Sequence, residues 1–172
     1  MSDDDDNFIK KLKKKRRPSN CIRKKTTNNS RHMTSLAVID LDETLIDSKY
    51  KLYFGADKFL EKLRQHSYIL LWTMGNEQHV NCFFKEYPQC KILIDSFKCG
   101  LVNKTKPVNV ARQLVYDKIK KYFPTTFLVD DNSHHLKNSC YDLAFNVLDY
   151  LSYNNKMDYV KLYSNISAAL KH

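Results

Sequence analysis

The chain has 172 residues and a formal net charge of +10 at pH 7, a length that suffices for one domain with a sizeable core. It contains no apolar run of membrane-spanning length and no secretory signal pattern at its start, which argues against a membrane protein. Five scattered cysteines without a CxxC pair favour idle thiols in a reducing compartment, so we expect a soluble intracellular protein.

The positive charge is concentrated in residues 1–34, which hold 11 Lys and Arg against 4 Asp. This segment has few apolar side chains whose burial could offset the entropy of ordering it, so we expect a disordered tail followed by a single domain over residues 35–172. The block KKLKKKRRP at residues 10–18 is typical of a nuclear import signal, or of an electrostatic contact with nucleic acid, nucleoprotein or an acidic partner. A solubilising arm without a specific partner is the alternative.

From residue 35 onward, short apolar segments alternate with longer amphipathic ones. The expected strands are LAVID (36–40), YILLW (68–72), KILIDSF (91–97) and TTFLVDD (125–131). The expected helices are residues 57–66, 76–87 and 107–123, with a further helix at the C-terminal end. Strands that alternate with helices predict an α/β domain with a central, mostly parallel sheet.

Residues able to carry chemistry follow these strands, and in a parallel sheet the carboxyl ends of strands meet at one edge. Two acids that end a buried strand repel each other, so a fold that keeps both ionised usually binds a cation. Acids that hold a divalent cation, with a hydroxyl and an ammonium group beside them, form a coherent set for phosphoryl transfer. The residues are Asp40, Asp42 and Thr44, then Thr73, then Lys106 (with Lys104 as a competitor), then Asp130 and Asp131.

Several of these residues also have a structural interpretation. Thr73 could cap the helix that follows it, and Asp130 with Asp131 could form a turn. A lysine before a helix is usually an ordinary surface residue. His134 and His135 suggest a metal site, but adjacent side chains point apart, so we expect both to be loop residues beside the site.

The ordered series of DLDET, a strand-terminal Thr, a Lys and a hydrophobic run ending in DD resembles the motif series of the haloacid dehalogenase (HAD) superfamily. Within it, LWTMGN (71–76) and FLVDDNS (127–133) are similar to segments of the FCP/SCP-like (NLI-interacting-factor-like) phosphatases, which act on the C-terminal domain of RNA polymerase. The resemblance implies a HAD-like (Rossmannoid) three-layer sandwich and a Mg²⁺ cofactor. His134 stands where those phosphatases have a proline, and Met74 replaces a small residue, but neither change removes a chemical group.

The resemblance implies a role for each matching position. Asp40 would be the nucleophile that forms an aspartyl-phosphate, and Asp42 the general acid and then the general base. Thr73 and Lys106 would bind phosphoryl oxygens, and Thr44 would orient the loop. The implied Mg²⁺ ligands are Asp40, the backbone carbonyl of Asp42, Asp131 and, as support or second ligand, Asp130.

The spacing of the motifs leaves no room for a large cap domain, because residues 45–71 and 75–106 each hold only short elements. We therefore expect an open site that suits a macromolecular substrate, most readily a protein carrying phosphoserine or phosphothreonine. A nucleic-acid 3′-phosphatase whose tail holds DNA or RNA is one alternative. A HAD-fold assembly scaffold with little or no catalysis is the other.

The strings DLDETLID and TKP, with the richness in Asn, Lys and Tyr, are similar to the baculovirus 38K protein family of large insect DNA viruses. That resemblance implies a role in nucleocapsid assembly, in the host nucleus or the virion. Cellular phosphatases of similar size share these features, so the sequence leaves a viral or cellular origin open, together with the oligomeric state.

Overall fold

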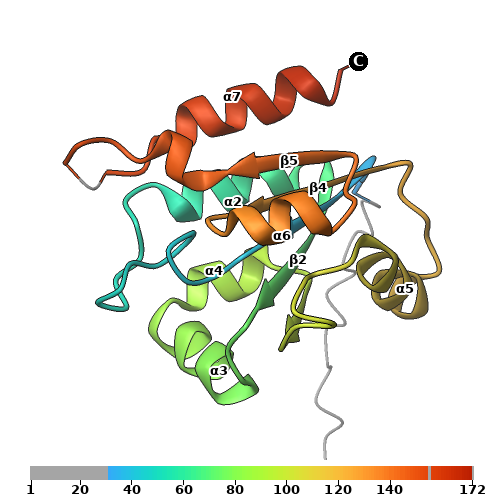
Figure 1. Cartoon of the computed structure of the whole chain (residues 1–172), viewed down its shortest axis with the longest axis horizontal. Helices are drawn as coiled ribbons and strands as arrows, with labels where there is room; N and C mark the ends of the chain where they lie inside the picture. The colour runs from blue at the N-terminus through green and yellow to red at the C-terminus, as the bar shows by residue number, and fades with distance from the viewer. Residues whose placement is uncertain (1–30, 155, 172) are drawn as a thin grey trace, which may run out of the picture. The chain divides into compact units, whose positions relative to one another are not determined.

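The computed structural model describes residues 31–154 and 156–171, and its centre is a five-stranded parallel sheet in the order β3-β2-β1-β4-β5 (Figure 1). The strands are β1 (Ser35–Ile39), β2 (Ser67–Thr73), β3 (Ser96–Cys99), β4 (Thr125–Asp130) and β5 (Leu143–Asn146). The helices are α2 (Ala56–Arg64), α3 (Glu77–Glu86), α4 (Pro88–Leu93), α5 (Val108–Ile119), α6 (Ser133–Asn138), the 3₁₀ helix η1 (Val147–Tyr150) and α7 (Tyr159–Ala169).

The central strand β1 is buried on both faces, because its side chains alternate between two hydrophobic clusters. Ala37 and Ile39 belong to a cluster shared with α2, α3, α4 and α7. Leu36 and Val38 belong to a second cluster, shared with α5. Every residue of the run LAVI is apolar because neither face of this strand is exposed to water.

Helices on both faces of a parallel sheet make a three-layer α/β sandwich, so the predicted α/β class with a central parallel sheet is confirmed. Between β1 and β2 the chain forms only a loop and α2, and between β2 and β3 only α3 and α4. Neither connection contains a cap domain, as expected.

Two predicted elements differ from the structure. Residues 91–97 were expected to form a strand, but α4 continues to Leu93 and β3 begins only at Ser96. Pro88 at the first helical position favours the helix, and Cys90 and Ile94 are buried four residues apart, which is a helical spacing. The helix expected over 107–123 ends at Ile119, where the next residue adopts a left-handed conformation with φ of 54°.

The boundary between tail and domain was set at residue 35, and residues 1–30 of that tail lie outside the described part of the chain. Arg31, Met33 and Thr34, just before the boundary, contact the domain. Arg31 forms an ion pair of 2.6 Å with Asp95, and the backbone N–H of Thr34 donates to the carbonyl of His66. Contacts of the domain therefore reach back to Arg31, while the predicted disorder of the preceding residues stays a prediction.

The strand order reverses direction at β1. The chain adds β2 and then β3 on one side of β1, and later adds β4 and β5 on the other. In sheets of this kind, ligands bind outside the carboxyl ends of the strands at the point of reversal. Here that point lies between the ends of β1 and β4, where Asp40 and Asp130 are found.

Over residues 31–154 and 156–171, none of the helices has the length and apolar character needed to cross a membrane.

We predict that Trp72→Phe destabilises the protein by about 2 kcal/mol, because it removes a buried hydrogen bond. Trp72 is fully buried, and its indole N–H donates to the carbonyl of Gly100 at 2.8 Å, which ties β2 to the segment after β3. Urea unfolding should be followed by circular dichroism, because Trp72 is the only tryptophan. The exposed Tyr122→Phe serves as control, and an equal free energy of unfolding in both variants would contradict the prediction.

Candidate active site

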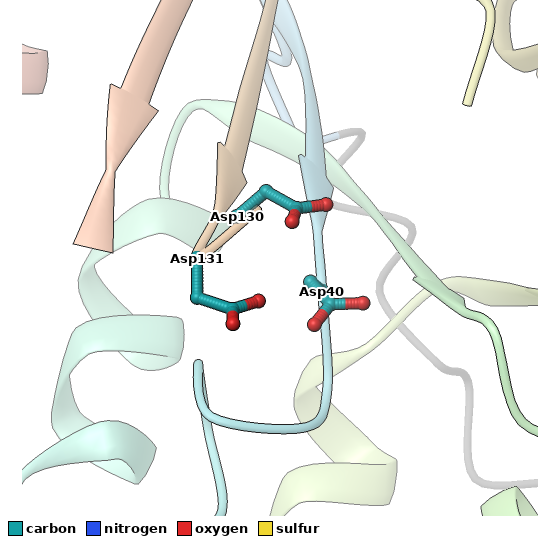
Figure 2. Close-up of side chains that lie close together, drawn as sticks. All are labelled: Asp40, Asp130 and Asp131. Atoms are coloured by element: carbon teal, nitrogen blue, oxygen red, sulfur yellow. The ribbon is translucent and has the colours of Figure 1, made fainter. Parts of the chain in front are cut away.

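Three carboxylates meet at the point where the strand order reverses (Figure 2). Asp40 directly follows β1, Asp130 is the last residue of β4, and Asp131 comes next in the chain. Each offers an oxygen, and these oxygens all lie within 4.8 Å of one another. The structure therefore brings together three of the acids that the sequence singled out, from positions far apart in the chain.

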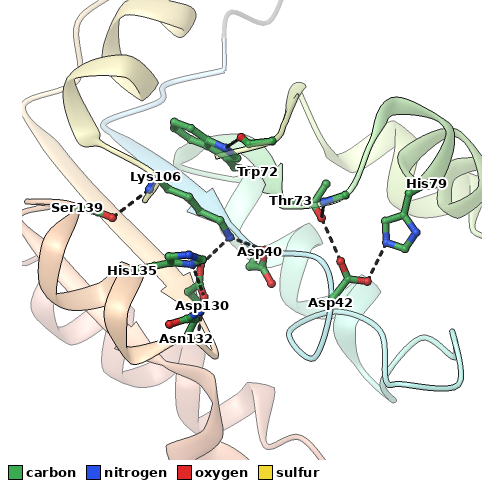
Figure 3. A network of polar contacts seen from close by, with 12 residues as sticks. Asp40, Asp42, Trp72, Thr73, His79, Lys106, Asp130, Asn132, His135 and Ser139 are labelled. Atoms are coloured by element: carbon green, nitrogen blue, oxygen red, sulfur yellow. Dashed lines mark hydrogen bonds and ion pairs between the residues drawn. The ribbon is translucent and has the colours of Figure 1, made fainter. Parts of the chain in front are cut away.

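Lys106 is the cation of this cluster. Its side chain is fully buried, and its ammonium group contacts a carboxylate oxygen of Asp40 and, at 2.6 Å, one of Asp130 (Figure 3). Ser139 holds the backbone at Lys106, since the Ser139 hydroxyl accepts a hydrogen bond from the N–H of Lys106 at 3.4 Å. Lys104 is exposed, so of the two lysines that the sequence left open it is Lys106 that contacts the acids, and its predicted contact with phosphate stays a prediction.

Asp130 is fully occupied by protein partners. Besides Lys106, it accepts from the backbone N–H of Asn132 at 2.8 Å and lies 3.2 Å from Nδ1 of His135. His135 was expected in a loop, but it lies in α6, whose helical turn carries it back under the end of β4. Had this short helix been predicted, its spacing would have placed His135 against the strand end. His134 is exposed, so the two histidines do point apart.

The acids outnumber the cation that contacts them. Burial, aided by the negative charges of Asp130 and Asp131, outweighs the attraction of Lys106 and raises the pKa of Asp40 to about 7. The pKa of Asp131 is also raised, first by burial and then by the charge of Asp130. A hard divalent cation fits this excess of carboxylate oxygen, and Asp40 and Asp131 are the side chains placed to hold it.

Asp42 belongs to a separate group, because its side chain lies outside the three-carboxylate cluster. One of its oxygens accepts from the hydroxyl of Thr73 at 3.1 Å, and the other lies 2.8 Å from Nε2 of His79. The helix α3 is capped by Asn76, whose side chain accepts from the N–H of His79, so Thr73 is not the cap. The predicted phosphate contact of Thr73 stays a prediction.

Sequence reasoning missed His79. It lies in a segment correctly predicted to be helical, but the direction in which one polar residue of that helix points depends on how the helix docks. The only available signal was its position one turn after the cap, close in the chain to the strand end that carries Thr73.

The loop between Asp40 and Ile46 is held in place by a contact with α7. Tyr159, at the start of that helix, donates its hydroxyl to the carbonyl of Thr44. Glu43 adopts a left-handed conformation with φ of 55°, and the N–H of Leu45 then donates back to the carbonyl of Leu41 at 2.8 Å. The side chain of Thr44 is buried, and the expectation that it orients the loop stays a prediction.

Comparison with known proteins gives a family and a structural likeness. A protein-family model described as "Protein of unknown function (DUF705)" matches residues 9–100, slightly more than half of the chain. A search of curated proteins found no match. Among solved structures, the fission yeast RNA polymerase II CTD phosphatase Fcp1 bound to beryllium fluoride is similar at 14% identity, with a TM-score of 0.46. The likeness covers 96% of this chain but only 54% of that one, and it does not bear on activity.

We predict that Asp131→Asn stabilises the metal-free protein by roughly 1 kcal/mol, because it removes one of three clustered anions. The same variant should lose the rise in melting temperature that Mg²⁺ gives the wild type, since a missing ligand weakens the cation site. Thermal unfolding with and without Mg²⁺ measures both effects. Asp117→Asn, an exposed carboxylate on α5, is the matched control. A wild-type response to Mg²⁺ in Asp131→Asn would contradict the assignment.

The affinity for Mg²⁺ should depend on pH through Asp40. Its pKa is raised to about 7, so below that pH the metal-free protein carries a proton that an incoming cation must displace. We expect the affinity to fall about tenfold for each pH unit below 7 and to level off above it. Calorimetric titration in buffers of different ionisation enthalpy counts the released proton. An affinity that does not change with pH, without proton release, would refute this.

Proposed function

We propose that this chain, which belongs to the family described as "Protein of unknown function (DUF705)", is a Mg²⁺-dependent phosphoric monoester hydrolase that acts through an aspartyl-phosphate. The observation that carries the proposal is the position of Asp40. Its carboxylate stands at the end of the central strand, where the strand order reverses, beside the buried ammonium group of Lys106 and the carboxylate of Asp131. A nucleophile for phosphorus needs these neighbours, because charge accumulates on the phosphoryl oxygens during transfer.

In the first step, a carboxylate oxygen of Asp40 attacks phosphorus while the bond between phosphorus and the ester oxygen breaks. Asp42 gives its proton to the departing oxygen, so the leaving group departs as an alcohol. Lys106 holds Asp40 in place and offsets negative charge as the phosphoryl group arrives. The products of this step are the free alcohol and an acyl phosphate, the mixed anhydride of the Asp40 carboxyl group with phosphate.

In the second step, the Asp42 carboxylate takes a proton from water as the water oxygen attacks phosphorus. The bond between phosphorus and the Asp40 oxygen breaks, which restores the Asp40 carboxylate and releases inorganic phosphate. Asp42 ends the step protonated, ready for the next cycle. Splitting one displacement into two lets the same pair of acids serve both halves of the reaction.

Mg²⁺ would be held by Asp40, by Asp131 and by the backbone carbonyl of Asp42, with Asp130 as support. When bound, it would neutralise charge on the phosphoryl oxygens and between the carboxylates. The protein residues alone compensate only part of that charge, since a single lysine contacts the three-carboxylate cluster in the described part of the chain.

The proposed substrate is a macromolecule, most readily a protein carrying phosphoserine or phosphothreonine. Support comes from the two short connections that leave the site without a cap domain. The basic block at residues 10–18 would bring the enzyme to acidic or nucleic-acid-bound targets in the nucleus. The resemblance to the baculovirus 38K family makes nucleocapsid assembly the proposed setting.

Two alternatives arise from the same features. The basic block favours a nucleic-acid 3′-phosphatase, whose affinity for DNA ends would fall steeply with salt. An assembly scaffold with little catalysis is the other alternative. The three-carboxylate cluster counts against it, because a scaffold gains nothing from keeping mutually repelling acids together.

The test is hydrolysis by the full chain of three esters: para-nitrophenyl phosphate, a phosphoserine peptide and a 3′-phosphorylated DNA strand, each with Mg²⁺ and with EDTA. We predict Mg²⁺-dependent turnover that falls on the order of 10³-fold or more in Asp40→Asn, because the nucleophile is lost. Asp117→Asn should match the wild type.

Preference for the peptide over the DNA strand supports the proposed substrate, and the reverse preference supports the 3′-phosphatase. If folded protein that binds Mg²⁺ hydrolyses none of the three esters, the proposal of an enzyme is wrong and the scaffold stands.

A further inference from the structure

We propose that His79 is a positioning residue that orients the carboxyl group of Asp42 for proton transfer to the leaving oxygen. This inference rests on the proposed function, in which Asp42 is the general acid. It assigns a role to a residue outside the motif series. The role follows from the contacts of His79 itself.

His79 and Thr73 together fix both oxygens of Asp42 (Figure 3). Nε2 of His79 lies 2.8 Å from one oxygen, and the Thr73 hydroxyl donates to the other at 3.1 Å. The Asp42 side chain is 48% exposed, so burial does little to hold it. Two partners from two different elements, the start of α3 and the end of β2, therefore determine which way the carboxyl group faces.

His79 is itself held in place from several sides. Its backbone N–H donates to the capping side chain of Asn76 at 2.9 Å, and its carbonyl accepts from the hydroxyl of Tyr50 at 2.8 Å. The Tyr50 ring also packs edge-on against the imidazole, with ring centroids 5.3 Å apart. These contacts fix the backbone of His79 and pack one side of its ring, so the imidazole can hold a second side chain in a defined orientation.

Gly75 supplies the space that the imidazole occupies. A Cβ at this position would lie 2.7 Å from Cδ2 of His79, which is too close for the ring to stay where it is. The Gly75 N–H also donates to the Thr73 hydroxyl at 3.0 Å. Gly75 thus helps to place both partners of Asp42, because it leaves room for the His79 ring and donates a hydrogen bond to the Thr73 hydroxyl.

A merely structural purpose for the contact would be to tie α3 to the loop after β1. The exposure of both side chains argues against this, because His79 is 27% and Asp42 is 48% exposed. Pairs at the surface contribute little to stability. Their main consequence here is the direction of the Asp42 carboxyl group.

The test compares two esters that differ in how much they need a general acid. Phenyl phosphate has a poor leaving group that must be protonated, whereas 2,4-dinitrophenyl phosphate departs readily without a proton. The quantity measured is kcat/KM, which covers the steps up to transfer of the phosphoryl group to Asp40.

We expect His79→Ala to lower kcat/KM by about 10- to 100-fold for phenyl phosphate and by less than about threefold for 2,4-dinitrophenyl phosphate. His79→Gln keeps an N–H donor near the position of Nε2 and should recover most of the loss. His66→Ala is the matched control, because His66 precedes β2 at the opposite end of that strand from Thr73. It should lower neither value.

A double-mutant cycle with Gly75→Ala gives an independent test. Alone, Gly75→Ala should reproduce the selective loss on phenyl phosphate, because the new methyl group displaces the imidazole. In the His79→Ala background it should add less than about twofold, since the ring that it displaces is gone.

The inference is wrong if His79→Ala lowers kcat/KM equally for both esters, or lowers it for neither. It is also wrong if Gly75→Ala has the same effect on kcat/KM in the His79→Ala background as in the wild type. Turnover of 2,4-dinitrophenyl phosphate shows that each variant is folded and has an intact nucleophile. Failure of the proposed function gives a different result, namely a wild type without Asp40-dependent turnover of either ester.

Discussion

The buried contact of Lys106 with Asp40 and Asp130 is the interaction on which the rest of the site depends. A fully buried ammonium group is tolerated only when carboxylates surround it, and carboxylates packed this closely need a cation in return. Each residue therefore explains the burial of the others. The contact also joins three elements, the end of β1, the end of β4 and the segment before α5, at the place where the order of the sheet reverses.

Most of this arrangement could be predicted from the sequence, because its causes are local. A β-branched run that ends in acids indicates a buried strand with a polar end, and alternation with amphipathic segments indicates a parallel sheet. Together these two facts place Asp40 and Asp130 at one edge. These sequence patterns do not tell whether Lys104 or Lys106 contacts the acids, since the turn before α5 determines which of the two side chains enters the core.

What could not be predicted depends on how short elements dock. His135 reaches Asp130 only because six residues after the strand form a helix, and β3 was misplaced because α4 uses the apolar residues that suggested a strand. The pairing of His79 with Asp42 requires the approach of α3 to the loop after β1, which no periodicity encodes. Side chains at the tips of loops and the starts of helices are set by tertiary packing, while strand interiors are set by composition.

The sequence distance between the members of the cluster has a consequence for the newly made protein. Lys106 lies 66 residues after Asp40 and 24 residues before Asp130. During synthesis, β1 therefore leaves the ribosome long before β4, the second strand that pairs with it, has been made. Until β4 emerges, one edge of β1 lacks its partner, and Asp40 stands without the two other acids of the cluster. A cation that requires all three acids would therefore bind the finished molecule and not the nascent chain.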